Sequence, residues 1–158
     1  DFSEPMMKRA QRKVLEKGLS QTIALSLGDA LFLPFRDNTF SASMIAFGLR
    51  NIVKKEQALS EMVRVIKRHG KVIILEFTFP QKGLMRRLYP VYFQRVLPWV
   101  GGVISGNRAA YAYLPESVLH FTSAKHYEEM MKKVGLENVS SQSLTGGVAS
   151  VISGIKKY

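Results

Sequence analysis

Two apolar runs separated by an amphipathic stretch constrain the fold of this chain more than any other feature. Residues 43–47 (SMIAF) and 71–77 (KVIILEF) have the length and apolar content of buried strands. Between them, residues 55–67 have the spacing of an amphipathic helix, with Ala58, Leu59, Met62, Val63 and Ile66 on one face. This order predicts two parallel neighbouring strands joined by a right-handed crossover. Because residues 72–75 are all aliphatic, we expect a central strand that is buried on both faces.

Further segments show the periodicity of regular secondary structure. We expect a helix from Ser3 to Gly18, a short buried strand at 22–27, a helix at 123–134 and a hairpin of strands at 137–142 and 148–156. Glycines end the expected helices, including Gly70 after the central one. Together these elements predict a single α/β domain with a mostly parallel sheet and a C-terminal antiparallel hairpin.

The composition is that of a globular domain. The 158 residues are 46% hydrophobic, yet no apolar run approaches the length of about 20 residues that crosses a bilayer. The chain has no cysteine, which excludes disulfides, thiolate metal sites and a cysteine nucleophile. We expect a cytoplasmic protein that can reach the inner face of the membrane. The sequence leaves the oligomeric state open, with a dimer among the options.

The charge balance is unusual, because 23 lysine and arginine residues face 12 acidic ones, for a net charge of +11. Such an excess favours an anionic partner, which can be a nucleic acid, an anionic lipid or an acidic substrate. It is equally compatible with a role in solubility alone, since net charge bears on association and not on fold.

The segment at about 80–121 differs in kind from the rest and predicts a lid-like insertion. Its part at 82–99 mixes aromatic and aliphatic residues with basic ones, and it contains Pro90 and Pro98, which break helices. A lid that packs its apolar face on the core is the first interpretation. Peripheral contact with a lipid surface is the second. Base stacking on nucleic acid is disfavoured by the prolines and aliphatics, so no nucleic-acid partner is expected.

Polar residues follow the expected strands, which is where ligands bind in open α/β sheets. Arg50 and Asn51 come just after one strand and Asp29 just after another, where its carboxylate can accept from an adenine amino group. Asp1 can be the last residue of a further strand, where a carboxylate can bind ribose hydroxyls. Each of them also has a plainer interpretation as a turn or helix-cap residue. No metal site is expected, and no zinc-hydrolase, serine-hydrolase or P-loop motif occurs.

In this order the motifs make the chain similar to the class I S-adenosylmethionine-dependent methyltransferases, which have a Rossmann-like fold. More narrowly, the chain resembles the C-methyltransferases of ubiquinone and menaquinone biosynthesis from its first residue nearly to its last. The matching pieces are Asp1-Phe2-Ser3-x-x-Met6, Gly28-Asp29-Ala30-x-x-Leu33-Pro34-Phe35, Phe47-Gly48-Leu49-Arg50-Asn51, Glu61-Met62-x-Arg64-Val65, Leu75-Glu76, Tyr113-Leu114-x-x-Ser117 and Leu144-Thr145-Gly146-Gly147-Val148-Ala149. The combination of FGLRN with LTGGVA is specific to the narrower family, whereas GDA and LPF are common to many methyltransferases.

The resemblance implies S-adenosylmethionine as the cofactor and a polyprenylated hydroquinone as the substrate. Asp1 would bind the cofactor ribose, and Asp29 and Ala30 would hold its adenine. Position 46 would lie beside the cofactor, where Ala46 stands in place of the serine that the family often has. The resemblance also implies that the two residues of the Arg50-Asn51 pair face the substrate.

The chemistry of C-methylation agrees with an arginine at that position. Electron density must be pushed from a ring oxygen to the adjacent carbon, and a phenol with a pKa near 10 is mostly neutral at pH 7. A guanidinium nearby, acting directly or through an ordered water, stabilises the phenolate and remains charged itself. The enzyme then needs mainly to align the carbon with the sulfonium methyl group and to exclude water, without a metal.

One departure from the family is large. Its first strand and glycine-rich cofactor loop would precede Asp1, and no G-x-G-x-x-G-like sequence occurs in the chain. We therefore expect an N-terminally incomplete methyltransferase domain that binds S-adenosylmethionine poorly or not at all by itself. Three alternatives remain: a methyltransferase acting on another lipid or small phenol, a basic module that binds nucleic acid or membranes without catalysis, and a structural remnant without activity.

Overall fold

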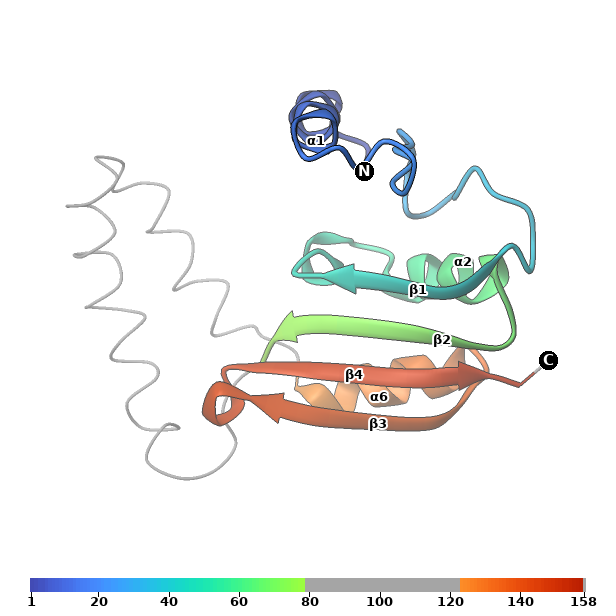
Figure 1. Ribbon diagram of the computed structural model, residues 1–158. Helices are drawn as coiled ribbons and strands as arrows, with labels where there is room; N and C mark the ends of the chain where they lie inside the picture. Colours follow the sequence, from blue (N-terminus) through green and yellow to red (C-terminus); the bar gives the residue numbers. More distant parts are fainter. Residues whose placement is uncertain (79–122, 158) are drawn as a thin grey trace.

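The computed structural model describes residues 1–78 and 123–157 (Figure 1). In chain order, its elements are α1 (Glu4–Glu16), β1 (Phe40–Ala46), the short 3₁₀ turn η1 (Leu49–Asn51), α2 (Lys55–Val65), β2 (Ile66–Phe77), α6 (Ala124–Lys133), β3 (Leu136–Leu144), the 3₁₀ turn η3 (Thr145–Gly147) and β4 (Ala149–Lys156). The lid-like insertion expected at about 80–121 and its part at 82–99 lie outside the described residues.

The four strands form one mixed sheet in the order β1-β2-β4-β3 (Figure 1). β1 and β2 are parallel, with Ser43 opposite Val72 and Ala46 opposite Leu75. β4 runs antiparallel to both β2 and β3. The parallel pair joined by α2 and the C-terminal antiparallel hairpin are therefore both confirmed, as is the helix expected at 123–134.

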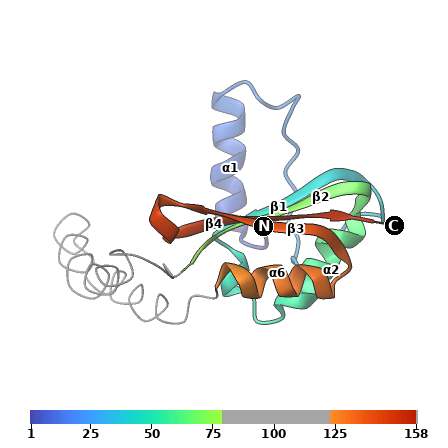
Figure 2. The same cartoon turned by 90° about the horizontal axis from the view of Figure 1, so that it is seen from below.

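The hydrophobic core lies on the face of the sheet that α2 and α6 cover, whereas α1 lies on the other side and has no buried residue (Figure 2). Val72 and Ile74 of β2 are fully buried in this core, while the alternate residues Ile73 and Leu75 are only half-buried. Among the described residues, the expected burial of β2 on both faces is thus wrong, because only the face toward α2 and α6 is packed against helices that bury side chains. The largest fully buried apolar side chains are Leu49, Leu59, Val65, Ile66, Val72, Ile74, Tyr127, Met131 and Ile152.

β2 is longer than the apolar run in its sequence, because α2 passes directly into it. The helix ends at Val65 and the strand begins at Ile66. The stretch that follows forms a bulge, at which the register with β1 shifts. Gly70 lies in this bulge, where a Cβ would come within 2.7 Å of the carbonyl oxygen of Lys67 and 2.9 Å of that of Ser41. The expected helix end at Gly70 is therefore wrong, and this glycine instead permits a close approach of backbone.

Residues 22–27 form no strand in the structure, so that expectation is wrong as well. Their apolar side chains Ile23, Leu25 and Leu27 keep 40%, 40% and 55% of their surface exposed. An extended segment becomes a strand through hydrogen bonds to a neighbour, and among the described residues this segment finds such a neighbour only at Asp1. Within residues 1–78 and 123–157, no helix is long and apolar enough to cross a membrane.

Candidate functional site

Arg50 lies just beyond the carboxyl end of β1, where the chain turns sharply into η1. Phe47 opens the turn with a φ of 53°, in the left-handed region that residues other than glycine rarely adopt. At Gly48, a Cβ would come within 3.3 Å of the side chain of Ile45. This tight turn brings Arg50 back over the neighbouring strand, and its backbone N–H donates to the side chain that ends β2.

The acceptor is Glu76, whose side chain has no exposed surface. Glu76 Oε1 lies 2.5 Å from Arg50 Nη1 and 3.0 Å from the backbone nitrogen of Phe77. Its Oε2 accepts from the backbone N–H of Arg50 at 3.1 Å. The same Nη1 of Arg50 also donates to the carbonyl oxygen of Phe47 at 2.8 Å. One carboxylate therefore fixes both the backbone and the side chain of Arg50, and these donors compensate for the burial of its charge.

Two aromatic rings complete the surroundings of the guanidinium. Arg50 Cζ lies 5.4 Å from the centroid of the Phe77 ring, within the range of a cation–π contact. The Phe77 ring packs in turn on that of Phe47, with centroids 4.6 Å apart. Arg50 keeps 25% of its side chain exposed, and among the described residues its Nη2 and Nε have no hydrogen-bond partner. The site thus offers fixed N–H donors beside aromatic rings, which suits an oxygen carried on an aromatic ligand.

The turn between β3 and β4 closes the same end of the sheet. Thr78 follows β2 directly, and its Oγ1 lies 3.0 Å from the carbonyl oxygen of Gly147 and 2.9 Å from the hydroxyl of Ser150. Thr78 and Ser150 are both buried. Residues 145–147 all have positive φ, which explains two consecutive glycines there. The LTGGVA motif therefore shapes a turn that is tied to the strand end carrying Glu76.

Asp1 and Asp29 lie together in a second place. The amino group of Asp1 donates to the carbonyl oxygen of Ser26 at 3.4 Å, and the N–H of Gly28 donates to that of Asp1 at 3.1 Å. This alternation is the pattern of parallel strands, so Asp1 pairs as the end of a strand would. Both exposed carboxylates accept a backbone N–H two residues further on, at 2.9 Å in each case. Their Oδ2 atoms have no partner among the described residues.

The remaining candidate residues are small or exposed. Ala30, in the loop after the aspartate, packs against the hydrophobic core. Ala46 is exposed at the end of β1, and Asn51 is exposed in η1, with no side-chain hydrogen bond to any described residue. The candidates thus form two groups, an arginine group (Ala46, Arg50, Asn51) and an aspartate group (Asp1, Asp29, Ala30). No hydrogen bond or ion pair between described residues joins the two.

Arg64 on α2 holds the loop between the aspartate group and β1. Its guanidinium donates to the carboxylates of Glu61, at 2.6 and 2.8 Å, and Asp37, at 2.7 Å. It also donates to the carbonyl oxygens of Leu33, at 3.0 Å, and Phe35, at 2.7 Å. The hydrogen bonds from Arg64 lower the pKa of Glu61 despite its burial, and those to Glu61 and Asp37 raise the pKa of Arg64. The E-M-x-R-V motif therefore supports the loop that contains L-P-F.

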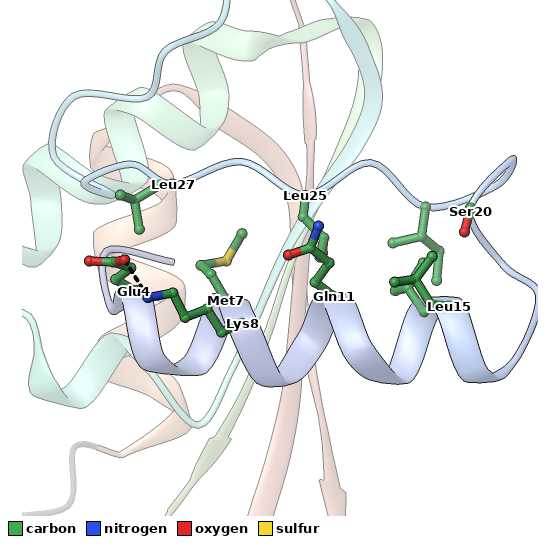
Figure 3. A pocket seen from close by; sticks show the side chains of 10 residues that line it. Glu4, Met7, Lys8, Gln11, Leu15, Ser20, Leu25 and Leu27 are labelled. Atoms are coloured by element: carbon green, nitrogen blue, oxygen red, sulfur yellow. Dashed lines mark ion pairs between the residues drawn. The ribbon is translucent and has the colours of Figure 1, made fainter.

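Two grooves lie along α1. One, of about 500 Å³, runs between α1 and the chain at 20–27, and the ion pair of Glu4 with Lys8 (2.8 Å) lies at one end of it (Figure 3). The other, of about 450 Å³, is lined by Asp1, Gly28 and the L-P-F loop among other residues. Only this second groove includes a residue of the aspartate group, and neither is lined by Arg50.

The order of elements and the topology of the sheet define the class I methyltransferase fold. The [4+2]-cyclase SpnF has a similar structure, with a TM-score of 0.71 at 17% identity over 99% of this chain and 65% of that one. A SAM-dependent methyltransferase from Aquifex aeolicus has a TM-score of 0.67 at 18% identity, over 98% of this chain and 65% of that one. At such identities the likeness shows the fold alone, and the cyclase illustrates that this fold also carries other reactions.

Sequence relationships place the chain within this class more closely. Residues 1–156 match the ubiE/COQ5 methyltransferase family, and the chain belongs to that family. It is 41% identical over 156 residues to a ubiquinone/menaquinone biosynthesis C-methyltransferase of Geobacter sulfurreducens, covering 99% of this chain and 60% of the relative. It is 46% identical over 151 residues to a demethylmenaquinone methyltransferase of Thermus thermophilus, covering 96% and 67%. It is 40% identical over 158 residues to the mitochondrial 2-methoxy-6-polyprenyl-1,4-benzoquinol methylase of Bos taurus, covering 100% and 48%. The chain therefore spans about half to two thirds of the length of these relatives.

Glu76 is the residue of the site to which the sequence assigned no role. The sequence does contain a signal for Glu76, because this residue shares one face of the strand with Val72 and Ile74, which are buried. An acid on the buried face of a strand requires a partner, and Arg50 was the candidate cation at the neighbouring strand end. Nothing comparable in the sequence pointed to the contact between Thr78 and Ser150.

Proposed function

We propose that the protein transfers a methyl group from S-adenosylmethionine to a ring carbon of a polyprenylated hydroquinone. The observation that carries this proposal is Arg50, held beyond the carboxyl ends of two parallel strands in a chain of the ubiE/COQ5 family. Two relatives have names that specify demethylmenaquinone and a polyprenyl benzoquinol as the compounds they methylate. Because the chain spans only part of their length, both the activity and the substrate belong to this proposal.

The aspartate group supports the choice of cofactor. Asp1 and Asp29 each keep a carboxylate oxygen without a partner among the described residues, which suits a ribose hydroxyl and an adenine amino group. Gly28 and Pro34 both line the second groove, and a Cβ at Gly28 would come within 3.0 Å of Pro34. A glycine at this position therefore lets the two segments lie close together beside the groove. When bound, S-adenosylmethionine supplies an electrophilic methyl group on its sulfonium.

The arginine group supplies the chemistry on the substrate side. Arg50 donates its remaining N–H groups to a ring oxygen and stabilises the negative charge that develops there as the proton leaves. Charge on that oxygen would raise the electron density at the adjacent carbon, which would take the methyl group from the sulfonium as the S–C bond breaks and S-adenosylhomocysteine leaves. That carbon would then lose its proton to water, and the ring oxygen would be reprotonated, which restores the aromatic hydroquinone. Asn51 offers an exposed amide next to Arg50 and can bind a second oxygen of the ring or a water. Ala46 adds no polar group and leaves room beside the cofactor.

Product mass spectrometry tests the proposal directly. The full-length protein is given S-adenosylmethionine with demethylmenaquinol, with 2-methoxy-6-polyprenyl-1,4-benzoquinol, or with a small phenol that lacks the polyprenyl tail. We expect one of the two quinols to gain a methyl group on carbon, located by fragmentation of the ring. Methylation of the small phenol or of another lipid in preference to both quinols would replace the proposed substrate class by the alternative one.

We further propose that the protein reaches its apolar substrate at an anionic membrane surface. The net charge of +11 and the basic, aromatic segment at 82–99 support such a contact. Co-sedimentation with vesicles of phosphatidylglycerol, but not of phosphatidylcholine, is expected, and added salt should weaken it. Equal binding to both vesicles would contradict an electrostatic contact. Tight binding to polyanions in general, without any methyl transfer, would instead favour a non-enzymatic basic module.

A further inference from the structure

Glu76 is a buried residue that can fix the orientation of the Arg50 side chain without contacting the substrate itself. It is fully buried, and its oxygens accept the side-chain Nη1 and the backbone N–H of Arg50 at 2.5 and 3.1 Å. The neighbouring Phe77 donates its backbone N–H to the same carboxylate and lies with its ring 5.4 Å from the guanidinium carbon. The end of β2 thus contacts Arg50 in three ways.

We infer that Glu76 is a positioning residue for methyl transfer, which holds the Arg50 guanidinium in one orientation so that Nη2 and Nε meet the substrate oxygen. This inference rests on the proposed function. Both hydrogens of Nη1 are taken by Glu76 and by the carbonyl oxygen of Phe47. The contacts of Nη1 therefore fix the direction of the two remaining donors, Nη2 and Nε.

Stability alone is a weak explanation for this ion pair. Desolvation of a buried pair commonly cancels its attraction, and an apolar pair of similar size often serves the fold equally well. The ion pair instead restricts the Arg50 side chain to one rotamer. A free arginine side chain samples many rotamers, and in most of them its N–H groups would not point at the substrate. The pair also has little net charge, so Arg50 acts on a ring oxygen through directed N–H groups rather than as a diffuse cation.

A double-mutant cycle tests the inference in the full-length protein. Glu76→Gln keeps the shape of the side chain but removes the charge that holds Arg50, and we expect kcat to fall by about tenfold to a hundredfold. Affinity for S-adenosylmethionine, measured by calorimetry, should change little. Combined with Arg50→Lys, the same substitution should cause almost no further loss of kcat, because it acts only through the guanidinium. Glu129→Gln, on the exposed side of α6, is the matched control and should leave kcat unchanged.

If Glu76→Gln lowers kcat by the same factor in the wild type and in the Arg50→Lys variant, the inference is overturned, because Glu76 would then act through the fold. A crystal structure of the Glu76→Gln variant gives a readout that does not depend on activity. The Arg50 side chain should leave its position over Phe77 or lose its order there, and an unchanged Arg50 would also overturn the inference. If the wild-type protein methylates no hydroquinone, the proposed function fails, whereas the crystallographic result still decides whether Glu76 positions Arg50.

Discussion

Replacing Arg50 by lysine in the full-length protein separates the chemical role of this residue from its structural role. Lysine keeps the positive charge and can still reach the buried carboxylate of Glu76, so the ion pair survives in part. A single ammonium group cannot also replace Nη2 and Nε, which have no partner among the described residues. The substitution therefore removes the donors proposed for the substrate while it leaves the buried charge compensated.

The expected magnitudes differ between activity and stability. Removing a donor aimed at a developing oxyanion typically lowers kcat by about 100- to 1000-fold. The fold loses mainly the hydrogen bond to the carbonyl oxygen of Phe47 and the contact with the Phe77 ring, about 1–2 kcal/mol in all. The aspartate group shares no hydrogen bond with Arg50 among the described residues, so the affinity for the cofactor should hardly change.

Three measurements on the purified variant decide the matter: kcat by product formation, the Kd of S-adenosylmethionine by calorimetry, and the free energy of unfolding in urea. A large fall in kcat with a nearly constant Kd is the expected result. Equal losses in kcat and in cofactor affinity would refute the reasoning, because Arg50 would then only support the fold. A substitution at the exposed Arg12 on α1, Arg12→Lys, is the matched control and should leave all three quantities unchanged.

Three further predictions concern the stability of the fold. Lys156 donates to carbonyl oxygens at the end of α2 at 2.8 and 2.9 Å, so Lys156→Met should lower the free energy of unfolding in urea by about 1–2 kcal/mol. The control Lys157→Met should lower it by about 0–1 kcal/mol, and equal losses would contradict this capping role. Gly70→Ala should lower the free energy of unfolding by about 1–3 kcal/mol in the same assay, because its Cβ would meet backbone oxygens within 3 Å. The control Gly135→Ala has open space around its Cβ and should lower it by only about 1 kcal/mol, and the reverse order would contradict the account of the bulge. Because the pKa of Glu61 is lowered in the folded state, the stability that Glu61 contributes is present above its unfolded pKa, near 4.5, and is lost as the pH falls further. The difference in unfolding free energy between wild type and Glu61→Gln should therefore shrink from pH 7 to pH 3, and a constant difference would contradict the shift.

Most of the elements that the sequence predicted correctly have a pattern set by burial on one face, and α1, which has no buried residue, is the exception. The helix at 123–134 follows from Tyr127, Met130 and Met131, and all three are buried. The parallel strands around α2 follow from the apolar runs at 43–47 and 71–77, and the C-terminal hairpin follows from two strand-like segments on either side of residues 144–147. These local patterns are reliable because the packing that confirms them lies within the chain.

The errors arose where the structure depends on partners that the local pattern does not specify. Residues 22–27 have the composition of a strand, but their backbone finds a neighbour only at Asp1 among the described residues. The start of β2 has the composition of a turn, K-R-H-G, yet it pairs with β1 through a bulge at which Gly70 allows the backbones to meet. Propensity predicts neither outcome, because pairing with a distant segment decides both. Residues 22–27 find too few such hydrogen bonds among the described residues to become a strand, whereas β1 holds the start of β2 in the sheet.

The site also changes how the charge of the chain is understood. The sequence shows an excess of basic residues, and the resemblance implies that the Arg50 guanidinium faces a phenol and stabilises its phenolate. In the structure, however, Arg50 is paired with a carboxylate that has no exposed surface, so this ion pair itself adds little net charge at the place where the proposed substrate oxygen would bind. Under the proposed function, a neutral hydroquinone would bind there with little competition from anions in solution, and N–H groups already in place would stabilise the phenolate as its charge develops. Under the proposed function, the remaining basic residues would serve association, and the ion pair of Arg50 with Glu76 would serve methyl transfer.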